Sequence, residues 1–229
     1  MNAVSNRSWV AVEESDTEAI ARMFVHNRIV RIEPGNAFPL SSGSDSPGFL
    51  ICADRLLGLP GQFACVCQRL NSLVNKHYVT HGSDGVRVEA IAGVERGGGP
   101  FGIILARDFN LPYISVPKEG DIEDVLKVVS GKNILVVEDV ATSGSNIERA
   151  VEVLRIRGGT VLGALALAAY ELPSTKERFA RLKVPLHVLT TVRTIVEQAV
   201  SVGAMSSAHA AVMTKWIADP YAPHKAGAA

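Results

Sequence analysis

The fold of this chain is decided by one stretch of sequence, Ile134-Leu135-Val136-Val137-Glu138-Asp139-Val140-Ala141-Thr142-Ser143-Gly144-Ser145-Asn146. Four apolar residues in a row, without polar alternation, are typical of a parallel strand that is covered on both faces of its sheet. Small residues follow the two acids, and residues 147–154 carry apolar side chains at helical spacing. The sequence therefore predicts a buried strand, a short loop and a helix in direct succession, in a protein of the α/β class.

The residues at this corner have the chemistry of a sugar-phosphate site. Open α/β sheets bind ligands at the carboxyl ends of their strands. Free amides at the start of the helix, with the hydroxyls of the loop, suit a phosphate group. The carboxylates of Glu138 and Asp139 suit vicinal sugar hydroxyls or a hydrated Mg²⁺. Taken piece by piece, the pattern also fits an ordinary strand–loop–helix corner whose acids face water. No Gly-Lys-Ser/Thr follows the strand, so the corner is not a P-loop.

Composition narrows the class of protein. The 229 residues carry 23 basic and 23 acidic side chains, and a net charge of zero gives no sign of a nucleic-acid or membrane partner. Cys52, Cys65 and Cys67 do not have a zinc-site spacing and are interpreted as reduced thiols. No apolar run has membrane-spanning length, and the first residues do not form a signal peptide. We expect a cytoplasmic protein with one domain at residues 15–220 and flexible termini at residues 1–14 and 221–229.

Two further segments could form a ligand site. A strand at residues 86–92 leads into Gly93-Val94-Glu95-Arg96-Gly97-Gly98-Gly99-Pro100, where glycines allow close backbone approach to a ligand and Pro100 opens a helix. Residues 38–49 are rich in Ser, Gly and Pro, which is also the composition of a plain surface loop.

The remaining elements are predicted from periodicity, capping residues and breakers. Strands are predicted at residues 29–32, 49–53, 112–116 and 161–169, with an edge strand at 185–189. Helices are predicted at residues 15–28, 60–78, 100–110, 173–182, 191–202 and 206–217, with Thr190-Thr191 capping one of them and Trp216 packing on the body. Residues 121–131 fit either a short helix or a hairpin.

Taken whole, residues 134–146 resemble the phosphoribosyl pyrophosphate (PRPP) signature of type I phosphoribosyltransferases. The glycine-rich segment is similar to the pyrophosphate loop of the orotate phosphoribosyltransferases. Their substrate loop, Phe-x-Leu-x-Ser-Gly-x-x-Ser-Pro, is matched at Phe38, Leu40, Ser42, Gly43, Ser46 and Pro47. The ending Trp216-x-x-Asp219-Pro220 also resembles that branch, so the resemblance covers about residues 15–220.

The resemblance implies a type I phosphoribosyltransferase fold, with a parallel sheet flanked by helices and a small N-terminal hood at about residues 15–55. It implies a homodimer that makes orotidine 5′-phosphate and pyrophosphate from PRPP and orotate, in pyrimidine biosynthesis. Mg²⁺ would bind through pyrophosphate and the ribose hydroxyls, with no direct protein ligand assigned. The PRPP-binding residues would be Glu95, Arg96, Gly97, Gly98, Lys118, Glu138, Asp139, Ala141, Thr142, Ser143, Gly144, Ser145 and Asn146. The base would contact Ser41, Ser42, Gly43 and Phe49, and the catalytic residues would be Lys118 and Asp139.

The sequence departs from the orotate pattern at four places. Pro117 stands where the family has arginine before Lys-Glu, and the family's Lys-x-His-Gly segment is missing after Gly120. Ser41 replaces a frequent lysine, and Glu148 replaces a frequent arginine that holds the orotate carboxylate. Two alternatives follow: transfer to another nucleobase, or a PRPP-binding regulator without the catalytic loop. The retained base loop favours an enzyme.

Overall fold

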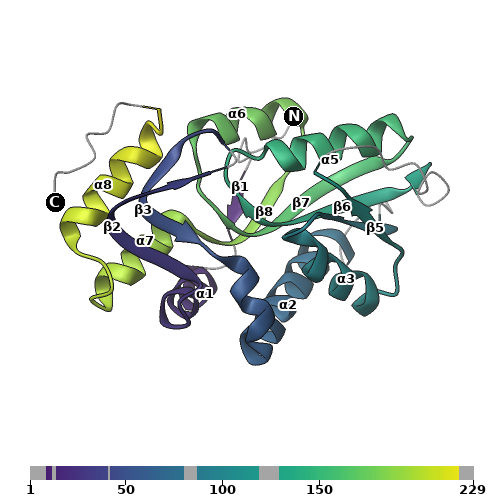
Figure 1. The fold of residues 1–229 in the computed structure, drawn as a ribbon. Coiled ribbons are helices and arrows are strands. Elements are labelled where there is room, and N and C mark those ends of the chain that lie inside the picture. The colour runs from purple at the N-terminus through teal and green to yellow at the C-terminus, as the bar shows by residue number, and fades with distance from the viewer. Residues whose placement is uncertain (1–8, 12–13, 41, 80–86, 119–128, 222–229) are drawn as a thin grey trace, which may run out of the picture.

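The centre of the fold is a six-stranded parallel sheet with strand order β1-β8-β7-β6-β4-β5 (Figure 1). The computed structural model describes residues 9–11, 14–40, 42–79, 87–118 and 129–221. The strands are β1 (Trp9–Ala11), β4 (Ala90–Val94), β5 (Tyr113–Val116), β6 (Asn133–Ala141), β7 (Thr160–Ala169) and β8 (Leu186–Thr191). The predicted signature strand is β6, between β4 and β7, and the α/β prediction is confirmed.

Helices cover both faces of this sheet, as the unbroken apolar run in β6 predicted. Leu135 and Val137 of β6 belong to one core, beneath α1 (Glu14–His26), α2 (Pro60–Val74), α3 (Gly98–Asp108) and α7 (Val192–Ser201). Ile134 and Val136 belong to the other, beneath α5 (Ser145–Ile156) and α6 (Pro173–Leu182). Figure 1 shows α5 and α6 above the sheet and α2 and α3 below it. The two cores fix β6 between them, and with it the loop that follows.

The hood is an antiparallel hairpin of β2 (Val30–Pro39) and β3 (Asp45–Ile51), in a sheet of its own. Two predicted boundaries are wrong: the end of the first strand at residue 32 and the start of the next at residue 49. Strand pairing continues past an irregularity between Ile32 and Ala37 as far as Pro39, which lies opposite Asp45. At the tip, Gly43 has φ +80° and its N–H donates to the Leu40 carbonyl at 3.0 Å. The Ser- and Pro-rich segment is therefore mostly strand.

The hood is joined to the body through the last helix, α8 (Ser207–Ala218). The Nε2 atom of His209 lies 2.8 Å from the Pro47 carbonyl oxygen of β3, and the Tyr221 hydroxyl donates to the Ser42 carbonyl at 2.9 Å. Trp216 is fully buried, as predicted. Thr191 caps α7 by accepting the Thr194 N–H, which confirms that prediction too.

The prediction of an edge strand at residues 185–189 is wrong. β8 is the second strand of the sheet, because Trp9–Ala11 pair with it in parallel from outside, with Val10 opposite His187. The segment predicted as a flexible N-terminal arm therefore contains a short strand, and residues 1–8 and 222–229 lie outside the described part.

Helix α2 ends at Val74 and continues as a π-helical turn, Asn75–Val79, and a 3₁₀ helix at Ala53–Gly58 precedes it. The three cysteines are free thiols. No helix in the described residues has the length and hydropathy to cross a membrane.

Candidate active site

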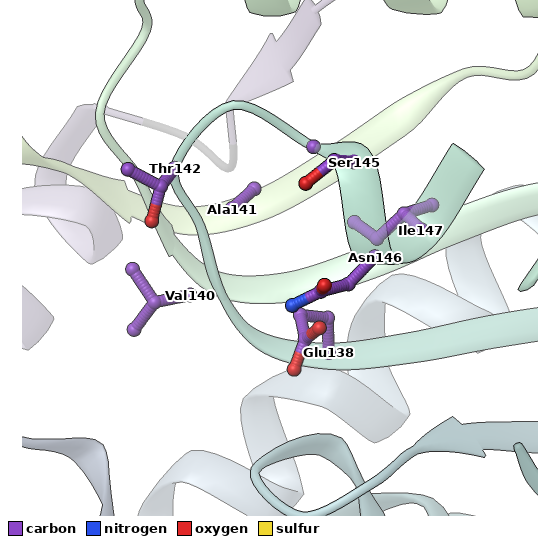
Figure 2. Close-up of a pocket in the computed structure, with 8 residues that line it drawn as sticks. Glu138, Val140, Ala141, Thr142, Ser145, Asn146 and Ile147 are labelled. Carbon is purple, nitrogen blue, oxygen red and sulfur yellow. The ribbon is translucent and has the colours of Figure 1, made fainter. Parts of the chain in front are cut away.

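A pocket lies at the carboxyl end of β6, where the chain turns into α5 (Figure 2). Thr142 and Ser143 of the turn are both buried. Figure 2 shows the lining residues arranged around the bend of the loop. They are Glu138, Val140, Ala141, Thr142, Gly144, Ser145, Asn146 and Ile147. The pocket thus contains most of the residues predicted to hold the ribose and its 5-phosphate, and the other two, Asp139 and Ser143, adjoin it in sequence.

The loop is shaped so that the first amides of α5 remain available to a ligand. Gly144 has φ +76°, a left-handed conformation that favours glycine, and a Cβ there would lie 2.7 Å from the Phe179 ring. The first helical hydrogen bond runs from the Glu148 N–H to the Gly144 carbonyl at 2.9 Å. The Ser145 N–H donates to the Ser143 hydroxyl at 3.4 Å, whereas the N–H groups of Asn146 and Ile147 have no acceptor within the helix. Amides at the start of a helix bind anions. The hydroxyl of Ser143 donates to that of Ser145 at 3.1 Å, which adds two adjacent hydroxyls to the same bend.

The acid pair at the end of β6 is asymmetric. Glu138 is 1% exposed, whereas Asp139 is half-buried. The Asp139 N–H donates to Glu138 Oε1 at 3.1 Å, and the Val140 N–H donates to Asp139 Oδ1 at 2.8 Å. Glu138 Oε2 is buried and has no hydrogen-bond partner among the described residues. A buried carboxyl oxygen in that state is expected to meet a donor, and a sugar hydroxyl or a Mg²⁺-bound water can supply one.

Burial and the neighbouring Asp139 carboxyl raise the pKa of Glu138 well above its ordinary value, because both disfavour the charged form. The positive charge of Lys118 acts in the opposite direction on this pKa. Lys118 is exposed and follows β5, so its ammonium group lies within electrostatic range of the acid pair. This places the predicted catalytic lysine at the same edge of the sheet as Asp139.

The glycine-rich loop after β4 packs directly on the end of β6. A Cβ on Gly97 would lie 2.2 Å from the Asp139 carboxyl carbon, and one on Gly98 would lie 2.1 Å from the Val137 carbonyl oxygen. Only glycine allows the loop to come this close, so the two predicted anion loops share one site. Arg96, joined to Glu95 by a cis peptide bond, is exposed there.

The structure corrects the predicted role of Glu95, whose backbone N–H was expected to bind an anion. Its N–H donates to the Val116 carbonyl at 2.9 Å, and its carboxylate accepts from the Ser115 hydroxyl at 2.5 Å. Its polar groups therefore hold β4 against β5. The amides left for an anion at this loop are those of residues 96–98.

The structure places Phe49 in the core, which corrects its predicted role as a base contact. The ring has no exposed surface and packs edge-on against Tyr170 at 6.3 Å between centroids. Tyr170 in turn donates its N–H to the Ala141 carbonyl at 3.0 Å. Phe49 thus links the hood to the 141–146 loop, and of the residues predicted to contact the base, Ser42 and Gly43 lie at the hairpin tip. Ser41 is outside the described residues.

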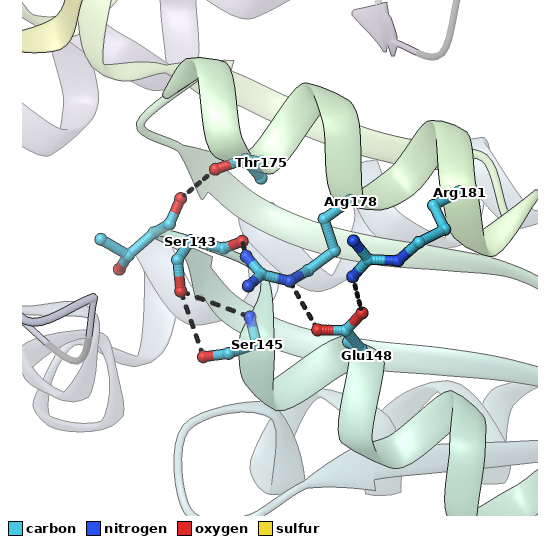
Figure 3. A network of polar contacts seen from close by, with 7 residues as sticks. Ser143, Ser145, Glu148, Thr175, Arg178 and Arg181 are labelled. Carbon is cyan, nitrogen blue, oxygen red and sulfur yellow. Dashed lines mark hydrogen bonds and ion pairs between the residues drawn. The ribbon is translucent and has the colours of Figure 1, made fainter. Parts of the chain in front are cut away.

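Helix α6 supplies contacts that sequence reasoning missed (Figure 3). The Thr175 hydroxyl donates to the Thr142 carbonyl at 2.6 Å, and Arg178 donates to the Ser143 carbonyl. Arg178 and Arg181 both pair with Glu148. The partners are at least 30 residues apart in the chain, so no local sequence pattern predicts these contacts.

Two adjacent strand-end loops around an acid pair have the geometry of a sugar-phosphate site, and comparison with known proteins identifies the family. The profile of the phosphoribosyl transferase domain matches residues 67–207. The chain is 30% identical to the orotate phosphoribosyltransferase of Bacteroides fragilis over 199 residues, 84% of this chain and 90% of the relative. It is 28% identical over 205 residues to that of Staphylococcus aureus, 86% of this chain and 96% of the relative.

Solved structures give the same picture. Orotate phosphoribosyltransferase from Aeropyrum pernix aligns with a TM-score of 0.64 and 31% identity, covering 82% of this chain and 99% of that one. UMP synthase from Leishmania donovani shares the fold, with a TM-score of 0.69 at 21% identity, over 88% of this chain and 42% of that longer chain. The chain belongs to the type I phosphoribosyltransferase family, in its orotate phosphoribosyltransferase branch.

Proposed function

We propose that this protein transfers the 5-phosphoribosyl group of PRPP to orotate, giving orotidine 5′-phosphate and pyrophosphate. The observation that carries the proposal is the contact between the two anion loops. Gly97 lies against the Asp139 side chain, and Gly98 lies against the backbone of β6 at Val137, the residue before the acid pair. Amides for two phosphate groups therefore flank carboxylates for a ribose, which is the order of groups in PRPP. The orotate phosphoribosyltransferases that resemble this chain support the choice of base.

In this assignment each end of PRPP has its own donors. Residues 142–146 hold the 5-phosphate, Asp139 and Glu138 hold the ribose hydroxyls, and residues 96–98 hold the pyrophosphate. A protonated Glu138, expected from its raised pKa, lowers the negative charge that the acid pair presents to a polyanionic substrate. Lys118 adds positive charge beside the leaving group.

The reaction requires little bond-making by the protein. The anomeric carbon gains oxocarbenium character as pyrophosphate departs, and the base nitrogen adds to it. Holding the two reactants in line and neutralising the leaving group supply the rate. The protein's contribution is therefore the rigid placement of both loops.

Mg²⁺ fits the donors present. In the described residues no group of three or more His, Cys, Asp or Glu side chains could hold a metal by itself. The carboxylate of Asp139 can accept hydrogen bonds from metal-bound water or ribose hydroxyls, and the unpartnered Oε2 of Glu138 can exchange a hydrogen bond with the same groups. When bound through pyrophosphate, Mg²⁺ would supply charge neutralisation on the leaving group.

A homodimer and a cytoplasmic location complete the proposal. Orotate phosphoribosyltransferase resemblance supports the dimer, and Leu57 and Ile103 are exposed apolar side chains available for such a contact. Three free thiols suit a reducing compartment. Sedimentation of the purified protein tests the dimer, and a monomer at micromolar concentration would contradict it.

A second candidate is transfer to a nucleobase without a carboxylate. Glu148, at the position where orotate enzymes often carry arginine, is engaged by Arg178 and Arg181 of α6. Position 148 thus holds a carboxylate, and the two arginines that reach it from α6 are engaged in ion pairs with it.

An ultraviolet assay with PRPP and Mg²⁺ tests both candidates. Orotate, uracil, adenine and guanine are offered in parallel, and loss of base absorbance is followed. Turnover of orotate alone supports the first proposal, and turnover of another base alone supports the second. Binding of PRPP without turnover of any base would overturn both and leave a PRPP-binding regulator.

A further inference from the structure

Helix α6 holds the 142–145 loop through hydrogen bonds from its side chains to the loop backbone (Figure 3). Two consecutive backbone carbonyls of the loop accept hydrogen bonds from α6 side chains. The Thr175 hydroxyl reaches the Thr142 carbonyl at 2.6 Å, and the Arg178 guanidinium reaches the Ser143 carbonyl. Thr175 has no exposed surface, and the side chain of Arg178 is 21% exposed. Water competes poorly for bonds buried to this extent, so they constrain the loop strongly.

These two bonds also set the direction of two amides. In a trans peptide unit, the carbonyl and the following N–H point to opposite sides of the chain. When Thr175 binds the Thr142 carbonyl, the Ser143 N–H must point away from α6. When Arg178 binds the Ser143 carbonyl, the Gly144 N–H must do the same. Both amides thus point away from α6 in a stretch of the loop where Thr142 and Gly144 line the pocket.

The same helix neutralises a carboxylate beside the phosphate site. Glu148 lies in the first turn of α5, where its charge would repel a bound phosphate. Arg178 Nε donates to Glu148 Oε2 at 2.6 Å, and Arg181 donates to Oε1. Burial raises the pKa of Glu148, and the bonds from Arg181 and Arg178 more than offset this and lower it. The carboxylate is thus ionised and fully paired, so little of its field reaches the loop.

We propose that Thr175 and Arg178 are positioning residues for the 5-phosphate of PRPP, acting through the backbone of the 142–145 loop. The inference rests on the proposed function of that loop. Neither side chain touches the substrate. Their effect should appear in affinity for the phosphate end of PRPP and leave the pyrophosphate end and the base unaffected.

Calorimetric titration of Arg178→Ala and Thr175→Val tests this. The probes are PRPP, ribose 5-phosphate and pyrophosphate, each with Mg²⁺. We expect each variant to bind PRPP and ribose 5-phosphate about tenfold more weakly, from the loss of a buried hydrogen bond, with pyrophosphate unchanged. Thr175→Ser keeps the hydroxyl and should restore wild-type affinity. Glu148→Gln in the Arg178→Ala background should recover part of the loss, because it removes a negative charge that only Arg181 would still pair.

Arg155→Ala is the matched control. Arg155 of α5 donates to the Leu182 carbonyl of α6 at 3.1 Å, so it joins the same two helices at their far end. Its loss should leave all three affinities within about twofold of wild type.

The outcomes separate this inference from the proposed function. A wild-type protein that binds neither PRPP nor ribose 5-phosphate overturns both. A wild-type protein that binds PRPP, with Arg178→Ala and Thr175→Val binding equally well, overturns only the role of α6. The role of α6 would be helix packing alone if Arg178→Ala and Arg155→Ala weakened PRPP binding equally. The same conclusion would follow if Arg178→Ala weakened pyrophosphate binding as much as ribose 5-phosphate binding.

Discussion

The two anion loops follow neighbouring parallel strands, yet they are held in different ways. The loop at residues 142–145 is positioned by donated hydrogen bonds from α6. The loop at residues 96–98 is positioned by the absence of side chains, which lets Gly97 and Gly98 lie against β6. Backbone amides can thus be directed either by restraint from another element or by close packing. The first arrangement should tolerate conservative changes, whereas the second should not.

Gly98→Ala is expected to have the largest effect. Its Cβ would lie 2.1 Å from the Val137 carbonyl oxygen and 2.8 Å from the Glu138 Cα, and both are backbone atoms that cannot turn aside. We expect PRPP affinity to fall roughly a hundredfold, with a lower melting temperature, because overpacking displaces the loop.

The neighbouring Gly99→Ala is the control for that variant. A Cβ there meets only the Tyr113 hydroxyl at 3.4 Å, an ordinary contact. Gly97→Ala should be intermediate, because the blocking atoms belong to the Asp139 side chain, which can rotate. Calorimetry and thermal melts of the three proteins check the order. Equal effects at Gly98 and Gly99 would contradict the packing account.

Asp139→Asn should be next in size. The amide keeps an acceptor for the Val140 N–H, so the fold is retained, while the negative charge facing the ribose hydroxyls is lost. We expect PRPP affinity or turnover to fall at least about tenfold, the usual scale for losing a charge-assisted hydrogen bond. Steady-state kinetics check this, and unchanged values would remove the ribose-hydroxyl assignment.

Lys118→Ala should lower kcat by about tenfold, because it removes positive charge from the side of the leaving group. Lys118→Arg should keep most of the activity. Lys132→Ala is a suitable control, since Lys132 pairs with Glu89 at the start of β6, at 3.3 Å. If Lys118→Ala turns over like the control, the catalytic role belongs elsewhere.

Glu138→Gln should have the smallest effect on function and a clear effect on stability. Because the folded-state pKa is raised above 4.5, the folded protein keeps a proton that the unfolded chain releases. Stability therefore falls as pH rises above that value, by up to about 1.4 kcal/mol per pH unit. The variant should lack this slope in urea unfolding between about pH 5 and pH 8. Identical slopes in both proteins would show that Glu138 is ionised.

Local patterns in the sequence predicted the signature corner well. The run into Glu138 and Asp139 gave β6, and Pro173 with the following pattern gave α6 over residues 173–182, as observed. Glycines before Pro100 indicated the second loop, because close approach and helix opening are both local properties. These features need no knowledge of distant residues.

Other features depend on pairing across the chain and were missed. Trp9–Ala11 have no periodicity of their own and become a strand by pairing with β8. Pairing of β3 with β2 places Phe49 in the core, which the loop-like composition of its segment concealed. Glu148 was read from its place in α5, whereas its partners lie about 30 residues further on. The site's backbone was thus predictable, and the side chains that restrain it were not.

The most direct test of the central claim is to titrate pyrophosphate and ribose 5-phosphate separately into the wild type, Gly98→Ala and Arg178→Ala. Two loops that hold opposite ends of PRPP predict that Gly98→Ala loses pyrophosphate affinity and keeps ribose 5-phosphate binding, and that Arg178→Ala does the reverse. Loss of both ligands in both variants, or no binding of either ligand to the wild type, would contradict the claim.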